Sequence, residues 1–218
     1  MEKYKYYVIN LKRRPDRFES FKKNYPLDIS KIDKVEAIDG RTLTNIPDNF
    51  KYLNVGEIGC FLSHKLIWEK TFFDKDSNYS IIFEDDAIFS ENFAKNFNEI
   101  INTNIDFDIL FVGGRFTNNY KMINCIKVTD KIVKYNYNKE WELIDCNRTT
   151  HAYIVSKKCC ELLLKYFYKI LKNNNINIIK FAPVDHFIMH VLRLNKIDIY
   201  HSFPLLCHSP LVGDSDIR

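Results

Sequence analysis

Several signatures of other protein classes are missing from this chain of 218 residues. No C-x-x-C pair occurs among its six cysteines, which argues against a zinc site. No segment is apolar over the length that crosses a membrane, and the N-terminal residues lack the continuous apolar stretch of a secretory signal. No stripe of lysine and arginine with interleaved aromatic residues is present, and a net charge of +4 is too small for a nucleic-acid-binding surface. We therefore expect no transmembrane segment and no nucleic-acid partner.

Glycine is scarce, with six residues, whereas aromatic residues make up 15% of the chain. The even number of cysteines permits disulfides, but the chain is far larger than a typical disulfide scaffold, so most cysteines are expected to be buried free thiols of a reducing compartment. Lysine, asparagine and isoleucine are abundant, which indicates AT-rich codon usage. Together these features predict a cytoplasmic protein, with peripheral membrane attachment as an option, of bacterial or large-DNA-virus origin.

Apolar segments typical of buried strands alternate with helical patterns along the chain. The expected strands cover residues 6–11, 32–38, 81–83, 107–114, 149–156 and 197–200, with an exposed strand at 133–137 inside a variable region. The expected helices begin near Pro15, Gly56, Ser90, Ser156 and Pro183, with the two serines as caps. No repeat or linker divides the chain. This alternation predicts an α/β fold with a mainly parallel central sheet flanked by helices, as a single domain over residues 1–218.

One stretch combines a buried strand with three carboxylates. Ile81, Ile82 and Phe83 run directly into Glu84, Asp85 and Asp86. The carboxylates then fall at the C-terminal end of a strand, where open α/β sheets bind ligands. Three adjacent anions repel one another, and a divalent cation with a preference for oxygen ligands would offset that repulsion. The alternative is a solvated acidic turn.

A basic loop follows the first expected strand. Arg13, Arg14 and Arg17 lie within five residues, just before and inside a helix that Pro15 and Asp16 can start. Backbone N–H groups at a helix start and arginine side chains both favour phosphate. We expect this loop to contact a phosphate or nucleotide; a solvated basic turn is the alternative.

Three other positions are candidates on the same grounds. Asp39 and Gly40 form a turn signal, and Asp39 could alternatively contact a ribose hydroxyl. Gly56 and Gly59 would allow a close backbone approach at a helix start, which places Ser63 and His64 one to two turns further on. Asp185 lies in the first turn of another helix, where it could be a dipole partner or a carboxylate aimed into a site.

Several of these segments, in this order, resemble glycosyltransferase family 25, which includes bacterial lipooligosaccharide galactosyltransferases and collagen hydroxylysine galactosyltransferases. The resemblance covers almost the whole chain. It is carried by Ile9-Asn10-Leu11-x-Arg13-Arg14-x-Asp16-Arg17, Gly56-Glu57-Ile58-Gly59-Cys60-x-Leu62-Ser63-His64 with Trp68, Glu84-Asp85-Asp86-Ala87, Ala152-Tyr153-Ile154-Val155-Ser156, Val184-Asp185 and Ser215-Asp216-Ile217. The chain departs from the family at His208-Ser209-Pro210, where a glutamine often precedes Ser-Asp-Ile.

The resemblance implies a GT-A type nucleotide-sugar-binding domain. It implies transfer of a hexose, usually galactose, from a UDP-sugar to a hydroxyl of a glycan, glycolipid or hydroxylysine-type protein acceptor, with inversion at the anomeric carbon. It implies Mn²⁺, or Mg²⁺, held by the acidic triplet. In this scheme Glu84 and Asp86 bind the metal with His208 as a third ligand, and Asp185 is the catalytic base. The expected contacts to the nucleotide-sugar are Asn10, Arg13, Arg14, Arg17, Asp39, Ser63, His64 and Asp85. Among the three acids of the triplet, Asp85 is the one expected to have the most structural role.

Three alternative functions remain. One is a non-catalytic domain that binds a sugar nucleotide or glycan. Another is a glucosyl- or N-acetylglucosaminyl-transferase on the same fold. The third is a metal-dependent phosphotransferase with Asp85 or Asp86 as the nucleophile.

Overall fold

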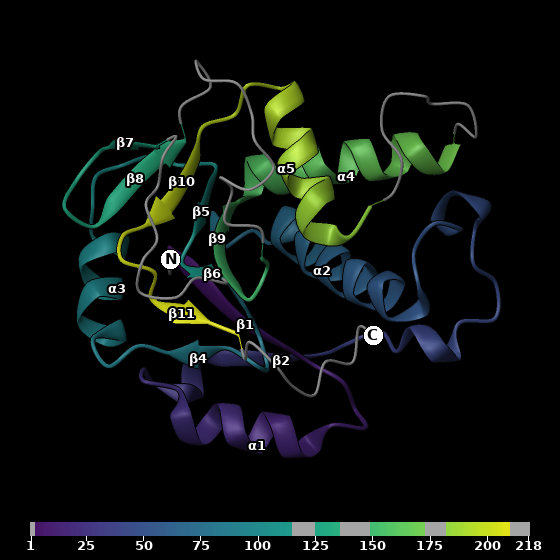
Figure 1. Cartoon of the computed structure of the whole chain (residues 1–218), viewed down its shortest axis with the longest axis horizontal. Coiled ribbons are helices and arrows are strands. Elements are labelled where there is room, and N and C mark those ends of the chain that lie inside the picture. The colour runs from purple at the N-terminus through teal and green to yellow at the C-terminus, as the bar shows by residue number, and fades with distance from the viewer. Residues whose placement is uncertain (1–2, 115–124, 136–148, 173–181, 210–218) are drawn as a thin grey trace.

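The structure is a computed structural model that describes residues 3–114, 125–135, 149–172 and 182–209 (Figure 1). Its helices are α1 (Pro15–Asn24), α2 (Val55–Phe73), α3 (Phe93–Ile101), α4 (Lys157–Lys172) and α5 (Val184–Leu194). Short 3₁₀ turns lie at η1 (Ile29–Lys31), η2 (Gly40–Thr42) and η3 (Asp48–Phe50). The strands are β1 (Tyr4–Asn10), β2 (Ile32–Glu36), β3 (Tyr79–Glu84), β4 (Ile88–Phe89), β5 (Ile109–Phe111), β6 (Gly113–Gly114), β7 (Cys125–Lys127), β8 (Ile132–Tyr135), β9 (Ala152–Ser156), β10 (Ile199–Ser202) and β11 (Cys207–His208).

An eight-stranded sheet in the order β2-β1-β3-β9-β5-β10-β8-β7 forms the centre of the molecule. The pairs β1–β2, β1–β3 and β5–β10 are parallel. The pairs β3–β9, β5–β9, β8–β10 and β7–β8 are antiparallel. The α/β class is confirmed, and the sheet is mixed because β9 and β8 each run antiparallel to both of their neighbours. A small second sheet, β4-β11-β6, lies beside it.

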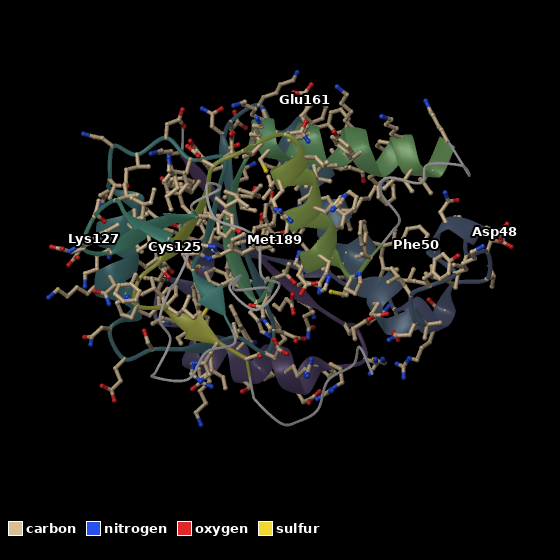
Figure 2. All side chains as sticks on the ribbon, turned by 45° about the horizontal axis from the view of Figure 1, so that its top comes forward. Asp48, Phe50, Cys125, Lys127, Glu161 and Met189 are labelled. Carbon is tan, nitrogen blue, oxygen red and sulfur yellow. The ribbon has the colours of Figure 1, made fainter. Side chains whose placement is uncertain are left out.

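Helices cover both faces of the sheet. Successive residues of β3 show this: Ile82 packs in the cluster that contains α2, α4 and α5, whereas Ile81 and Phe83 pack in the cluster that contains α1 and α3. Figure 1 shows α2, α4 and α5 grouped on one side and α1 on another. In Figure 2, the side chain of Met189 lies in the interior while Lys127 lies at the periphery, in agreement with their burial. This three-layer arrangement leaves the strand ends available for ligands.

Local sequence explains the start of α2. Asn54 accepts a hydrogen bond from the backbone N–H of Glu57, and the Glu57 carboxylate accepts one from the Asn54 N–H, both at 2.9 Å. This capping box fixes the first turn of α2 beside the ends of β1 and β2. Ser156 also caps its helix as predicted, because its Oγ accepts from Cys159 N at 3.0 Å.

Two local predictions were wrong. Ser90 does not cap α3: the N-cap residue is Asn92, without a side-chain hydrogen bond, and only the Ser90 carbonyl contacts the helix start. The strand predicted as exposed at residues 133–137 is β8, in which Ile132, Val133 and Tyr135 are buried, since it pairs with β10 inside the large sheet. Residues 136 and 137 lie outside the described residues. Among the described helices, none is long and apolar enough to cross a membrane.

Candidate active site

A pocket of about 290 Å³ lies at the C-terminal ends of the parallel strands β1, β2 and β3. The loops that follow these strands and the first turns of α2 line it. Parallel strands bring their C-terminal ends to one edge, which explains why motifs far apart in the sequence meet there. The predicted residues that line the pocket are Arg13, Arg17, Asp39, Ser63, His64, Glu84, Asp85 and Asp86.

The first of the three carboxylates, Glu84, is held through one oxygen. Its Oε1 lies 3.1 Å from His64 Nε2 and accepts a hydrogen bond from Thr150 Oγ1 at 2.5 Å. Burial alone would raise the pKa of Glu84, but the hydrogen bonds from His64 and Thr150 and the proximity of His151 lower it to about 2. Glu84 is therefore an anion at neutral pH, and none of its described hydrogen bonds uses Oε2.

Asp85 has a different environment. Its Oδ2 accepts a hydrogen bond from Asn10 Nδ2 at 2.7 Å, and its Oδ1 accepts one from Arg17 at 3.2 Å. Burial raises the pKa of Asp85 to about 6 despite these two partners. With both oxygens engaged, Asp85 ties the basic loop to the acidic triplet, which is a poor arrangement for a nucleophile.

Asp86 has the features expected of a cation ligand. Its Oδ1 is buried and makes no hydrogen bond among the described residues, and the same holds for Nδ1 of His151. Burial and the charge of Glu84 raise the pKa of Asp86. Ligand atoms of Glu84, Asp86 and His151 lie within 4.8 Å of one another. An unpaired buried carboxylate oxygen next to an imidazole nitrogen and a second carboxylate fits a divalent metal.

The arginines divide between two sides of this triplet. Arg13 Nε donates to Asp39 at 2.8 Å, and Arg41 donates to both oxygens of the same carboxylate at 3.0 and 2.8 Å. Arg14 instead pairs with Asp16 and lines a neighbouring cavity that also includes Arg17 and Asp85. Arg13, Arg41 and Arg17 thus place positive charge around the main pocket, while Arg14 points to the cavity beside α1.

Two glycines hold the walls of the pocket together. A Cβ on Gly40 would lie 1.7 Å from the carbonyl oxygen of Val55, and one on Gly59 would lie 2.5 Å from that of Ile38. The loop after β2 therefore packs backbone to backbone against α2. Ser63 strengthens this contact, because its Oγ accepts from Ile38 N at 2.9 Å and donates to Gly59 O at 2.7 Å. A close backbone approach was expected at this helix start. The segment that makes it is the loop after β2.

Besides Arg14, three predicted residues lie away from the pocket lining. Asn10 acts behind it, through Asp85 and the Arg14 carbonyl. Asp185 occupies the first turn of α5 and accepts a hydrogen bond from His186 N at 2.8 Å. The pKa of Cys60, a residue of the pocket, is raised by burial first, then by the charge of Glu84 and then by that of Asp185. His208 is exposed on β11 opposite Ile88 and is absent from the described groups of metal-ligating side chains. Residues 215–217 lie outside the described residues.

Sequence reasoning missed two contributors to the site, Thr150 and His151. Both directly precede β9, which runs antiparallel to β3, so the start of β9 meets the end of β3. The Glu84 N–H donates to the His151 carbonyl at 2.9 Å. The polar run Thr149-Thr150-His151 before an apolar strand was the available signal, but its use required the orientation of β9.

Comparison with known proteins now defines the class. A glycosyltransferase involved in the glycosylation of the major capsid of PBCV-1 superposes with a TM-score of 0.51 at 10% identity, covering 99% of this chain and 95% of that one. This similarity shows the fold, which is GT-A-like. The chain matches the model of glycosyltransferase family 25 (LPS biosynthesis protein) over residues 3–188, and it belongs to that family.

Relatives by sequence carry the same description. Human procollagen galactosyltransferase 2 is 29% identical over 126 residues, covering 49% of this chain and 20% of the relative. Procollagen galactosyltransferase 1-A of Xenopus laevis is 27% identical over 216 residues, covering 90% and 32%. The R655 glycosyltransferase candidate of Acanthamoeba polyphaga mimivirus is 36% identical over 114 residues, covering 47% and 35%. The chain thus spans about a third or less of the length of these relatives.

Proposed function

We propose that this protein is a metal-dependent, inverting glycosyltransferase that moves a hexose, galactose first among the candidates, from a UDP-sugar to a hydroxyl group. The observation that carries this proposal is the cluster of Glu84, Asp86 and His151, two of which line a pocket together with the basic loop. The family and its galactosyltransferase members support it.

Each part of the pocket has a role in this reaction. Mn²⁺ or Mg²⁺ held by Glu84, Asp86 and His151 would supply positive charge for the diphosphate leaving group. Arg13 and Arg17 line the same pocket and add fixed positive charge to it. The loop at Asp39 and the first turn of α2 form another wall of the pocket, and this wall is the proposed place of the nucleoside part.

Transfer with inversion requires one displacement. The acceptor oxygen forms a bond to the anomeric carbon, the bond from that carbon to the diphosphate oxygen breaks, and a general base takes the acceptor proton. Asp185, at the start of α5, is our proposed base. Its carboxylate would move closer to the donor when the acceptor binds. The acceptor is a glycan, a glycolipid or a hydroxylysine-type protein, and the reaction is proposed to take place in the cytoplasm.

A donor panel tests this function. UDP release is measured from UDP-galactose, UDP-glucose and UDP-N-acetylglucosamine, with Mn²⁺ and with EDTA. We expect slow hydrolysis of UDP-galactose that EDTA abolishes. Faster turnover of another UDP-sugar would replace the galactosyl assignment and keep the fold and metal dependence.

Asp86→Ala is the critical variant. It removes the carboxylate whose buried Oδ1 lacks a described hydrogen-bond partner, so turnover should fall by at least about 100-fold while folding is retained. Asp130→Ala is the matched control, because Asp130 is an exposed acid paired only to the surface Lys127 at 2.6 Å in the described contacts. Unchanged turnover in Asp86→Ala would remove the triplet from the mechanism.

A non-catalytic binding domain is the second candidate. Mouse inactive glycosyltransferase 25 family member 3 is 30% identical over 132 residues, covering 51% of this chain and 22% of the relative, so the family includes a member named as inactive. This candidate predicts a thermal shift with UDP and Mn²⁺ but no turnover of any donor.

A further inference from the structure

A buried chain of hydrogen bonds lies behind Glu84. Trp68 Nε1 donates to Tyr153 Oη at 3.0 Å, Tyr153 Oη lies 2.9 Å from His64 Nδ1, and His64 Nε2 lies 3.1 Å from Glu84 Oε1. Trp68, Tyr153 and His64 are each fully buried. This series of hydrogen bonds joins α2 to β9 and ends at Glu84, the first residue of the acidic triplet.

The chemistry of these groups orders the protons along the chain. The indole of Trp68 can only donate, so Tyr153 Oη accepts there. Its own hydroxyl proton then has one described acceptor, Nδ1 of His64. That leaves the His64 proton on Nε2, where it is donated to Glu84. We assign this arrangement because it gives every polar hydrogen of the Trp68, Tyr153 and His64 side chains an acceptor.

Glu84 therefore receives two fixed donors on one oxygen. Thr150 approaches Oε1 from the segment before β9, and His64 approaches it from α2. Without them, repulsion from Asp85 and Asp86 would favour rotation of the Glu84 side chain away from the triplet. With Oε1 held, the carboxylate plane is fixed and Oε2 is left for a ligand.

We propose that His64, backed by Tyr153 and Trp68, is a positioning residue that fixes the Glu84 carboxylate for cation binding. His64 lines the pocket, but it is thus assigned a role through Glu84 in place of direct contact with the donor. The proposal rests on the metal-dependent function above. Partners that orient metal ligands typically contribute about 10- to 100-fold to metal affinity.

Mn²⁺ binding, measured from the electron paramagnetic resonance signal of the free ion without any donor, tests the proposal. His64→Leu should raise the Kd for Mn²⁺ about 10- to 100-fold. Tyr153→Phe, which keeps the imidazole but removes the hydroxyl that orients it, should raise the Kd by a smaller factor. His64→Gln retains an N–H donor near the position of Nε2 and should restore most of the affinity.

Thr71→Val is the matched control for a buried polar loss in the same helix. Thr71 is fully buried and its Oγ1 lies 2.7 Å from Ser80 Oγ, with no described contact to Glu84. Its Mn²⁺ affinity should equal that of the parent protein, even where its melting temperature falls. An equal loss of affinity in Thr71→Val and Tyr153→Phe would show that the hydrogen bonds from Trp68 to Glu84 contribute only to stability, and it would overturn the proposal.

Two further outcomes separate this proposal from the function on which it rests. If Asp86→Ala binds Mn²⁺ as tightly as the parent protein, the metal centre itself is misplaced. If Asp86→Ala loses affinity but folded His64→Leu and Tyr153→Phe do not, the centre stands and the positioning role fails. In a Glu84→Gln background, His64→Leu should add no further loss, since His64 acts through Glu84.

Discussion

The two halves of the central sheet contribute to the site in different ways. In the first half, β2, β1 and β3 are parallel, and each supplies a loop of its own to the pocket. In the second half, β9 runs antiparallel to its neighbours and delivers Thr150 and His151 from its beginning. In the first half, local sequence motifs form the pocket lining. In the second half, the direction of β9 brings Thr150 and His151 to the carboxylate cluster.

The largest expected effect comes from breaking the first half at Gly40. In Gly40→Ala, the new Cβ would lie 1.7 Å from a backbone oxygen of α2, which cannot move without unwinding the helix start. We expect a loss of about 4–5 kcal/mol or more in the free energy of unfolding, measured by denaturant titration.

Gly113→Ala is the corresponding change outside the first half, in β6 of the small second sheet. Its Cβ would meet Cys207 Sγ at 2.8 Å and the backbone N of Ala152 at 3.0 Å, a smaller overlap than at Gly40. A cost of about 1–3 kcal/mol is expected. Equal costs at Gly40 and Gly113 would show that the backbone contact between the loop and α2 is not special.

The next effect concerns pH and the second half. His201 on β10 stacks on Phe111 with ring centroids 5.3 Å apart, and its buried Nδ1 has no described partner. Burial lowers the pKa of His201 from 6.5 to about 4. Because the unfolded chain takes up this proton at higher pH than the folded chain, the contribution of His201 to stability should fall as pH drops from 6.5 towards 4.

The loss through His201 should reach about 3 kcal/mol at most. Denaturant titrations at a series of pH values measure it. His201→Phe should remove this contribution, whereas His186→Gln, which changes an exposed histidine on α5, should retain it. Asp85, with its pKa raised to about 6, contributes in the opposite sense over this range, so the variant is compared with the parent. An identical pH dependence in His201→Phe and in the parent protein would contradict the prediction.

The smallest of these effects tests the junction of the two halves. His151→Ala should weaken Mn²⁺ binding about 10- to 100-fold, because it removes a nitrogen from the group with Glu84 and Asp86. His208→Ala should leave the affinity unchanged, since the exposed His208 is outside that group. Isothermal titration calorimetry with Mn²⁺ compares the two, and the reverse result would restore the ligand set expected from sequence.

Much of the first half could be predicted from sequence because its signals are local. The apolar run before Glu84, the arginines before α1 and the glycines of α2 each indicate a structure within about ten residues. The α/β class follows from their alternation. Asp85 was expected to be the most structural acid, and its hydrogen bonds from Asn10 and Arg17 agree.

The second half could not be predicted as well because its signals depend on pairing. Nothing in the residues of β9 specifies that it enters antiparallel between β3 and β5, yet that orientation decides that His151 meets Asp86. The same reasoning explains β8: its residues alternate as an exposed strand would, and its burial results from pairing with β10.

The antiparallel insertion of β9 has a consequence for protein engineering. A chimera that exchanges donor specificity would be cut most naturally between the motif-bearing first half and the remainder of the chain. Such a cut would separate Glu84 and Asp86 from Thr150 and His151. A recombinant that grafts only residues 1–114 onto another member of the family would therefore inherit a carboxylate pair without its matched imidazole, so the segment leading into β9 must travel with the graft.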